Sequence, residues 1–172
     1  MNVNFLKPFI EASAEVLEAE AGLQVTRGNL DLQKSALTTD DVTVVIHIIG
    51  DVYGVVLLGM PIQTGLNLVG RILEQEFTEW NSLAQSGVAE LSNVITGRSC
   101  VKLSKAGYEA NISPPVVITG SGVKISTLDF PRIIVPLETS AGKMLVHLAL
   151  REQTPGKQPE NIQLADLVTS SQ

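Results

Sequence analysis

The stretch VTVVIHIIGDVYGVVLLGM, residues 42–60, decides the fold of this chain. It contains two strongly apolar runs rich in β-branched residues, 42–49 and 53–60, on either side of Gly50-Asp51-Val52. Runs of this length and composition predict strands, and a short polar break between them predicts a hairpin turn. We therefore expect an antiparallel hairpin here.

Helical patterns flank the hairpin. Residues 4–21 carry apolar side chains every three or four positions, with Asn4 as the expected N-cap and Gly22 as the expected C-terminal stop. After the hairpin, residues 62–76 show the same spacing. Pro61 suits the first turn of that helix, because its fixed φ is already helical.

A long third helix follows, beginning at Thr78 or Ser82 and ending at Lys105 before Gly107. Ser82-Leu83-Ala84-Gln85 has the form of a capping box. The positions predicted to form the apolar arc of this helix are Leu83, Val88, Leu91, Val94 and Ile95.

Short extended runs complete the pattern. Each is β-branched or apolar and lies between turn residues. They are 23–26, 108–113, 116–119, 122–127, 133–138 and 144–150, with a turn at 139–142.

Composition limits the possible functions. The chain has 172 residues, of which 44% are hydrophobic and 17% charged, so it forms one globular domain. Its net charge of -6 argues against nucleic acid or an anionic membrane as the main partner. No apolar run reaches the ~18 residues needed to cross a bilayer. The single Cys100 excludes an intrachain disulfide and fits a reducing cytoplasm.

The polar C-terminal end reads differently from the rest. Residues 152–172 include Pro155 and Pro159, and we expect a loose tail with at most a short amphipathic turn at 162–168. The folded domain is expected to span residues 1–151.

The order helix, strands, hairpin occurs twice, which indicates an internal duplication. Ala21-Gly22 ends the first helix as Ala106-Gly107 ends the long one. Aligned on these pairs, Glu90 falls opposite Phe5 and Asn93 opposite Pro8. A site built on Glu90 and Asn93 would therefore occur once per chain.

Four residues of the long helix form the candidate site. Ser86, Glu90, Asn93 and Gly97 stand at i, i+4, i+7 and i+11, so they share one stripe beside the apolar arc. Small residues at both ends would let this stripe enter another protein's cleft, where a carboxylate can bind a cation and an amide can orient a water. The alternative interpretation is a solvated helix edge.

Other candidates are weaker. His47 and His147 lie in apolar strands, where a lone histidine is more often a core or sheet-face residue than a metal ligand. No His or basic cluster stands beside Cys100 to activate its thiol, so we interpret it as structural or idle. Gly120-Ser121-Gly122 lacks the Lys and the helix of a phosphate loop. We therefore predict no metal site.

The chain resembles the CheX branch of the CheC/CheX/FliY phosphatases of bacterial chemotaxis. That family shares a Ser or Asp, three residues, a Glu, two residues, an Asn and a later Pro, which here are Ser86, Glu90, Asn93 and Pro115. The resemblance extends over residues 1–150, and includes FLKPFIEA at 5–12 and IVPLETSAGK at 134–143. One Glu/Asn helix per chain is the pattern of the CheX type.

The resemblance implies a fold and a reaction. The fold is a single α/β (α+β) domain with two long helices on a mixed, largely antiparallel sheet and an internal pseudo-duplication, paired into a homodimer through edge strands. The reaction is hydrolysis of the aspartyl phosphate of a CheY-like response regulator, which carries the Mg²⁺ and a lysine. Glu90 would bind that lysine and Asn93 would direct the attacking water, while Ser86, Gly97 and Pro115 would contact the partner.

Two other functions stay open at this point. Flagellar-switch relatives of the family use the fold as a non-enzymatic adaptor that binds a receiver domain or a switch component. A small-ligand sensor is the third possibility. The intact Glu90 and Asn93 favour the enzyme.

Overall fold

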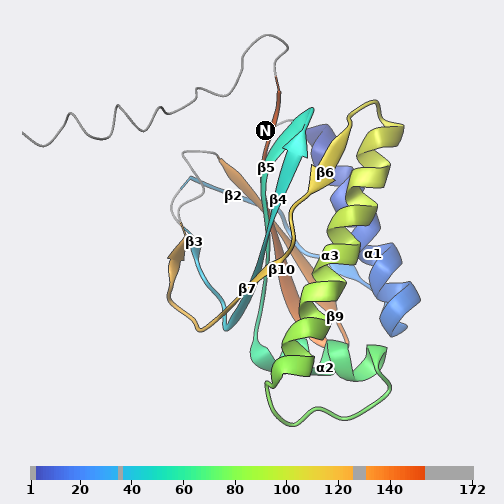
Figure 1. Ribbon diagram of the computed structural model, residues 1–172, viewed down its shortest axis with the longest axis vertical. Helices are drawn as coiled ribbons and strands as arrows, with labels where there is room; N and C mark the ends of the chain where they lie inside the picture. The colour runs from blue at the N-terminus through green and yellow to red at the C-terminus, as the bar shows by residue number, and fades with distance from the viewer. Residues whose placement is uncertain (1–2, 35–36, 126–130, 154–172) are drawn as a thin grey trace, which may run out of the picture.

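Two helices, α1 (Leu6–Ala21) and α3 (Ser82–Lys105), lie side by side on one face of an antiparallel sheet in the computed structural model (Figure 1). A shorter helix, α2 (Ile62–Ile72), lies across one end of this layer. The structure describes residues 3–34, 37–125 and 131–153. The fold predicted from the resemblance, a single α+β domain, is confirmed.

The sheet places the predicted hairpin near its centre, and every described pairing is antiparallel. The strands run in the order β1 (Thr26–Arg27), β9 (Arg132–Thr139), β10 (Gly142–Glu152), β5 (Val52–Met60), β4 (Val42–Gly50) and β6 (Ala110–Ile112). β2 (Asp31–Gln33) also pairs with β9, and β7 (Val116–Thr119) also pairs with β4. β3 (Leu37–Thr38) and β8 (Lys124–Ile125) form a separate ladder away from the helices (Figure 1).

The hairpin prediction is confirmed with one extra residue on each strand. The register runs from Val42 opposite Met60 to Ile48 opposite Gly54. Alternate side chains of both strands enter the core beneath the helices, as the two-residue period of a strand requires. These buried residues are Val44, Ile46, Ile48, Val56 and Leu58.

The first helix starts later than predicted. A 3-10 turn at Val3–Phe5 precedes α1, and the N-cap position belongs to Phe5, which makes no side-chain cap. The predicted cap at Asn4 is therefore wrong. Phe5 is held there by the core: it is fully buried and its ring meets Tyr108 edge-on with centroids 5.2 Å apart. The stop at Gly22 is confirmed by its left-handed φ of 62°.

The other two helix boundaries also differ in detail. α2 ends at Ile72 rather than 76, because the chain turns at Glu74 with a φ of 52°. The capping box predicted at Ser82 is wrong by one residue: Asn81 is the N-cap, and its side chain accepts a 2.9 Å hydrogen bond from the amide of Ala84. The end before Gly107 is confirmed.

The short strands were predicted least well. The run 108–113 contains only the three-residue β6, and the run 122–127 contains β8, with 126–127 outside the described residues. The extended piece predicted at 23–26 is found at 26–27. β2 and β3 were not predicted, because their short sequences carry no strong pattern of their own.

The C-terminal strand runs slightly past the predicted boundary at residue 151. Glu152 pairs with Val52, and the amide of Gln153 donates a 2.7 Å hydrogen bond to the carbonyl of Asp51. The predicted tail beyond this point and its amphipathic turn at 162–168 lie outside the described residues.

The duplication is visible in how the strands pair. The first half of the chain comprises α1 and β1–β5, and the second half comprises α3 and β6–β10. β1 and β2 of the first half pair with β9 of the second, and β6 and β7 of the second pair with β4 of the first. β3 pairs with β8 and β5 with β10. The halves therefore exchange strands around an approximate twofold, with α2 as an unmatched insertion.

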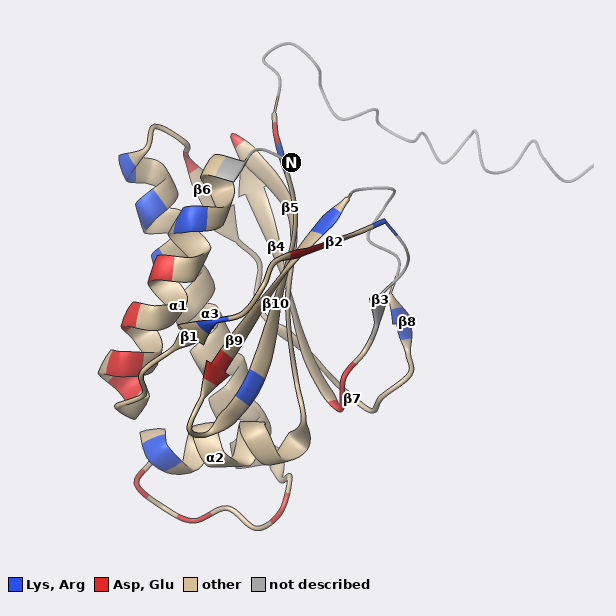
Figure 2. Cartoon of the chain, turned by 180° about the vertical axis from the view of Figure 1, so that it is seen from behind, with Lys and Arg blue, Asp and Glu red and all other residues tan. Residues whose placement is uncertain are grey.

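The hairpin strands β4 and β5 carry no Asp, Glu, Lys or Arg. Figure 2 shows charged residues on the helices and on the acidic connection between α2 and α3. None of the described helices combines the length and hydrophobicity that crossing a bilayer requires.

Candidate functional site

The buried polar residues on the inner face of α3 make their hydrogen bonds within the helix. The hydroxyl groups of Ser92, Thr96 and Ser99 are buried, and each donates a 2.8 Å hydrogen bond to the carbonyl four residues before it. Such bonds satisfy a buried hydroxyl without a partner from another element. These three residues therefore serve packing.

The outer face of α3 carries the predicted stripe. Ser86 and Glu90 are exposed, and Asn93 and Gly97 are partly exposed. Within the described part of the chain, the Glu90 carboxylate and the Asn93 carboxamide have no hydrogen-bond or ion-pair partner. The structure thus places these two groups one turn apart on a solvent-facing surface, with their bonding capacity unused.

Packing requires a glycine at one of two glycine positions of α3 but not at the other. A Cβ on Gly87 would stand 2.8 Å from both methyl groups of Val69, so close packing of α2 requires a glycine there. A Cβ on Gly97 would meet only the Cδ1 of Ile112, at an ordinary 3.7 Å. The fold of the chain therefore does not require Gly97 to be small.

Pro115 is partly exposed and lies in the connection between β6 and β7. Ile112 lies beside Gly97, and the indole nitrogen of Trp80 donates a 3.1 Å hydrogen bond to the Thr119 hydroxyl. Pro115 lies between these two contacts along the chain.

Two ion pairs connect α3 to α1. The Lys102 ammonium lies 2.6 Å from a Glu15 carboxylate oxygen and 3.5 Å from one of Glu11. The hydrogen bond from Lys102 lowers the pKa of Glu15, and the same bond raises the pKa of Lys102. Lys102 is thereby engaged with α1 rather than with the stripe.

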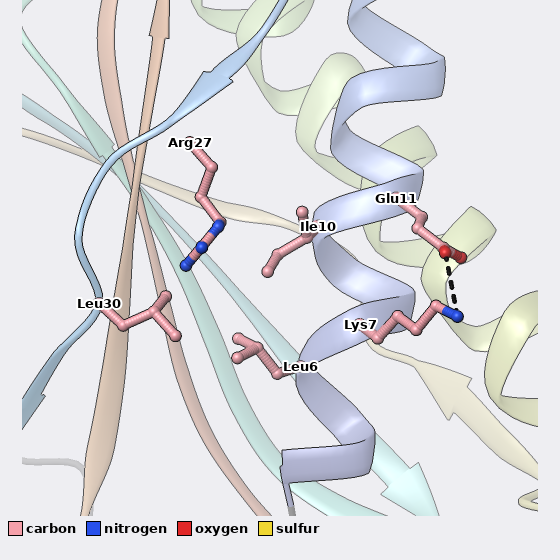
Figure 3. Close-up of a pocket in the computed structure, with 6 residues that line it drawn as sticks. All are labelled: Leu6, Lys7, Ile10, Glu11, Arg27 and Leu30. Carbon is pink, nitrogen blue, oxygen red and sulfur yellow. Dashed lines mark ion pairs between the residues drawn. The ribbon is translucent and has the colours of Figure 1, made fainter.

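An apolar cavity lies beside the part of α1 that corresponds, in the duplication, to the stripe on α3. Phe5 and Pro8, opposite Glu90 and Asn93 in the duplication, are both buried. A cavity of about 450 Å³ opens between α1 and the β1–β2 edge, where Leu6, Ile10 and Leu30 point toward one another beside Arg27 (Figure 3). It has an apolar floor and no carboxylate–amide pair at the matched positions. Its remaining lining residues are Lys7 and Glu11.

The cysteine and the two histidines, the three remaining candidates, differ in burial. Cys100 is buried, and burial raises the pKa of its thiol to about 11, which confirms a structural cysteine. His147 is 2% exposed, and burial together with the charge of Arg132 lowers its pKa to about 4. His47 lies exposed on β4. The described residues contain no group of three His, Cys, Asp or Glu side chains that could hold a metal ion.

Sequence reasoning misjudged the surroundings of the stripe. Leu83, assigned to the buried arc, is 50% exposed, and Val101 at the other end of α3 is 54% exposed. The signal was available in the spacing, since Leu83 is seven residues before Glu90 and Val101 four after Gly97. Both therefore share the face of the stripe.

Known proteins resemble this chain in sequence and in fold. The sequence profile described as "Chemotaxis phosphatase CheX" matches residues 42–138. The chain is 28% identical to the CheY-P phosphatase CheX of Thermotoga maritima over 112 residues, which span 64% of this chain and 68% of that protein.

Solved structures agree with the sequence match. A CheC-like superfamily protein from Shewanella sp. PV-4 is similar with a TM-score of 0.79 and 26% identity, over 88% of this chain and 99% of that one. In fold, the chain is also similar to a chain of the CheX–CheY–BeF3–Mg²⁺ complex from Borrelia burgdorferi, with a TM-score of 0.76 and 24% identity, over 88% and 100% of the two chains. Because the profile covers more than half of the sequence, this chain belongs to the CheX family of chemotaxis phosphatases.

Proposed function

We propose that this protein hydrolyses the aspartyl phosphate of a CheY-like response regulator. The observation that carries the proposal is the exposed Glu90 and the partly exposed Asn93, one turn apart on α3 and without side-chain partners among the described residues. The Thermotoga maritima relative, a CheY-P phosphatase, supports the choice of substrate.

The reaction requires little covalent chemistry from the residues of this chain. A water oxygen attacks the phosphorus, the bond between phosphorus and the aspartyl oxygen breaks, and inorganic phosphate leaves a free carboxylate. Catalysis of phosphoryl transfer consists mainly of positioning and charge stabilisation. The chain must therefore deliver a water in line with the breaking bond.

Asn93 and Glu90 divide this task. The carboxamide oxygen of Asn93 accepts a hydrogen from the water and fixes its direction toward phosphorus. The carboxylate of Glu90 binds a lysine of the regulator and holds the two proteins in register. Ser86, Gly97 and Pro115 contact the partner, and the small side chains at 86 and 97 allow the helix to approach.

The metal belongs to the partner in this proposal. The Borrelia burgdorferi complex contains CheX, CheY, BeF3 and Mg²⁺, which supports a divalent ion beside the phosphoryl group of the regulator. We assign no cofactor to this chain. The buried free thiol of Cys100 suits a reducing compartment, and we expect the reaction in the cytoplasm.

A non-enzymatic adaptor is the competing function. It would use the same stripe to bind a receiver domain without hydrolysis. The two functions differ at Asn93, because a water-orienting group matters to the rate and little to binding.

The test is hydrolysis with defined partners. Each stand-alone receiver domain of the same genome is phosphorylated with Mg²⁺ present, and loss of phosphate is followed with and without this protein. We expect accelerated loss from at least one receiver and a decrease of about 10²–10³ in rate for Asn93→Ala. Binding of that variant should persist. Binding without accelerated hydrolysis would establish the adaptor function. Full activity of Asn93→Ala would show that the stripe is an ordinary solvated helix edge.

A further inference from the structure

Two large apolar side chains extend the stripe at its ends. Leu83 is 50% exposed and Val101 54% exposed, although α3 is otherwise well packed on its inner face. Leu83 stands seven residues before Glu90, and Val101 four residues after Gly97, so both project from the same face as the catalytic pair.

The fold gives no reason for these residues. Single exposed apolar residues are common on protein surfaces, but these two occupy one face of one helix at either end of the site. Valine is also a poorer helix former than alanine, lysine or arginine at an exposed position. Neighbouring exposed positions of α3 carry the ordinary polar residues Arg98, Ser104 and Lys105.

Charge alone cannot select the partner of this surface. Glu90 is the single charged residue of the stripe, and Arg98 is the other charged residue between Leu83 and Val101. One solvent-facing carboxylate supplies at most one ion pair, which contributes modestly to affinity. Discrimination between similar receiver domains must then come from shape and apolar contact.

The spacing fits a single partner domain. Leu83 and Val101 are 18 residues apart, about 27 Å along a helix. A domain of 100–150 residues is about 35 Å across. One receiver domain can therefore touch both side chains while its phosphorylation site lies over Glu90 and Asn93.

We propose that Leu83 and Val101 are the specificity-determining contacts of this protein. They dock against apolar surface on either side of the receiver's phosphorylation site, fix its orientation along α3, and touch no reacting atom. This inference rests on the proposed function, because the occupant is the phosphorylated receiver domain.

The test separates binding from chemistry. Leu83→Ala and Val101→Ala are each expected to raise KM for the phosphorylated receiver about tenfold, with kcat within about twofold. Alanine is a good helix former, so α3 should stay intact. The conservative variants Leu83→Met and Val101→Ile should retain the wild-type KM. Ile49→Ala is the matched control, since Ile49 is 61% exposed on β4, away from α3.

Two outcomes would contradict the proposal, and a third measurement tests it independently of hydrolysis. Unchanged KM in the double variant Leu83→Ala/Val101→Ala would overturn it. If that variant turned a dimer into a monomer by light scattering and kept its KM, a second copy would be the occupant and the inference would be wrong. If no receiver is hydrolysed, affinity for BeF3-activated receivers still tests the contacts: a tenfold weaker Kd would sustain them although the phosphatase proposal had failed.

Discussion

The indole nitrogen of Trp80 donates a hydrogen bond of 3.1 Å to the hydroxyl of Thr119, which ties the segment before α3 to the end of β7. The same indole covers Gly65 of α2, where a Cβ would lie 3.0 Å from its Cζ3. One side chain therefore joins α2, the start of α3 and β7.

Removing the acceptor of that bond should loosen the site. Thr119→Val keeps the shape of the side chain and deletes its hydroxyl. We expect the free energy of unfolding to fall by about 1 kcal/mol, and KM for the phosphorylated receiver to rise because Pro115 shifts. Urea titration and steady-state kinetics measure the two effects. Thr26→Val, at an exposed threonine of β1, is the control. Equal values for both variants would show that the bond does not position the connection.

Neutralising Glu90 should weaken the complex itself. Glu90→Gln keeps the size of the side chain and removes its charge, so we expect a Kd for the activated receiver about tenfold higher, a slower reaction and a weaker dependence of Kd on salt. Stability should not change, since the carboxylate is exposed. Glu79→Gln, at an exposed carboxylate just before α3, is the matched control. Unaltered salt dependence would count against an ion pair with the partner.

The two glycines of α3 should respond in opposite ways to the same substitution. Gly87→Ala forces a methyl group against Val69 and should lower the free energy of unfolding by about 1–3 kcal/mol. Gly97→Ala meets no such obstacle, and its better helix propensity should raise stability by up to about 1 kcal/mol. At Gly97 the effect should fall on KM for the receiver. Thermal melts and kinetics on both variants check this, and an unchanged KM for Gly97→Ala would remove Gly97 from the partner surface.

His147 should make stability depend on pH in the acid range. Its pKa in the folded protein is about 4, against 6.5 for a free side chain. Below pH 6.5 the unfolded chain therefore binds a proton that the folded chain does not, and stability falls as the pH drops toward 4. The full loss is about 3 kcal/mol.

Urea midpoints between pH 7.5 and 4.5 measure this effect. His147→Leu should flatten the profile, whereas His47→Leu, at an exposed histidine of the same sheet, should leave it unchanged. Parallel profiles for wild type and His147→Leu would assign the acid sensitivity to other groups.

The predicted homodimer should form through an edge of the sheet. Among the described strands, one outer edge consists of β1 and β2 and the other of β6 and β7. β2 presents Leu32, which is 58% exposed. We expect a dimeric mass by light scattering at tens of micromolar and a shift toward monomer for Leu32→Lys, because lysine on an edge strand opposes pairing. Leu73→Lys, after α2, is the control. A monomeric wild type would contradict the prediction.

The sequence predicted the elements whose pattern is long and self-contained. The hairpin at 42–60 and the helix ending at Lys105 can each be recognised from the pattern of their own apolar residues. β2 could not be found, because Asp31-Leu32-Gln33 becomes a strand only by pairing with β9. The cap of α3 was misplaced by one residue, since Asn81 and Ser82 are both good N-caps and the choice depends on backbone geometry.

The site was predictable to the extent that it lies on one helix. Spacing alone put Ser86, Glu90, Asn93 and Gly97 on a common face. The position of Pro115 depends on the contacts of Ile112 and Thr119, which join residues far apart in sequence. Leu83 was assigned to the buried arc, although its spacing of seven residues from Glu90 already places it on the face of the stripe.

The exchange of strands between the two halves has a consequence during synthesis. When the first half leaves the ribosome, the β4–β5 hairpin has no neighbour on either side, because its partners are β6, β7 and β10. Residues 61–139 must be translated before β9 is complete and β10 can follow. At about 5–20 residues per second this takes roughly 4–16 s. Both edges of this apolar hairpin stay open until β6 and β7 are made, and the β5 edge stays open until β10 follows, so the hairpin must be kept from the nascent chains around it.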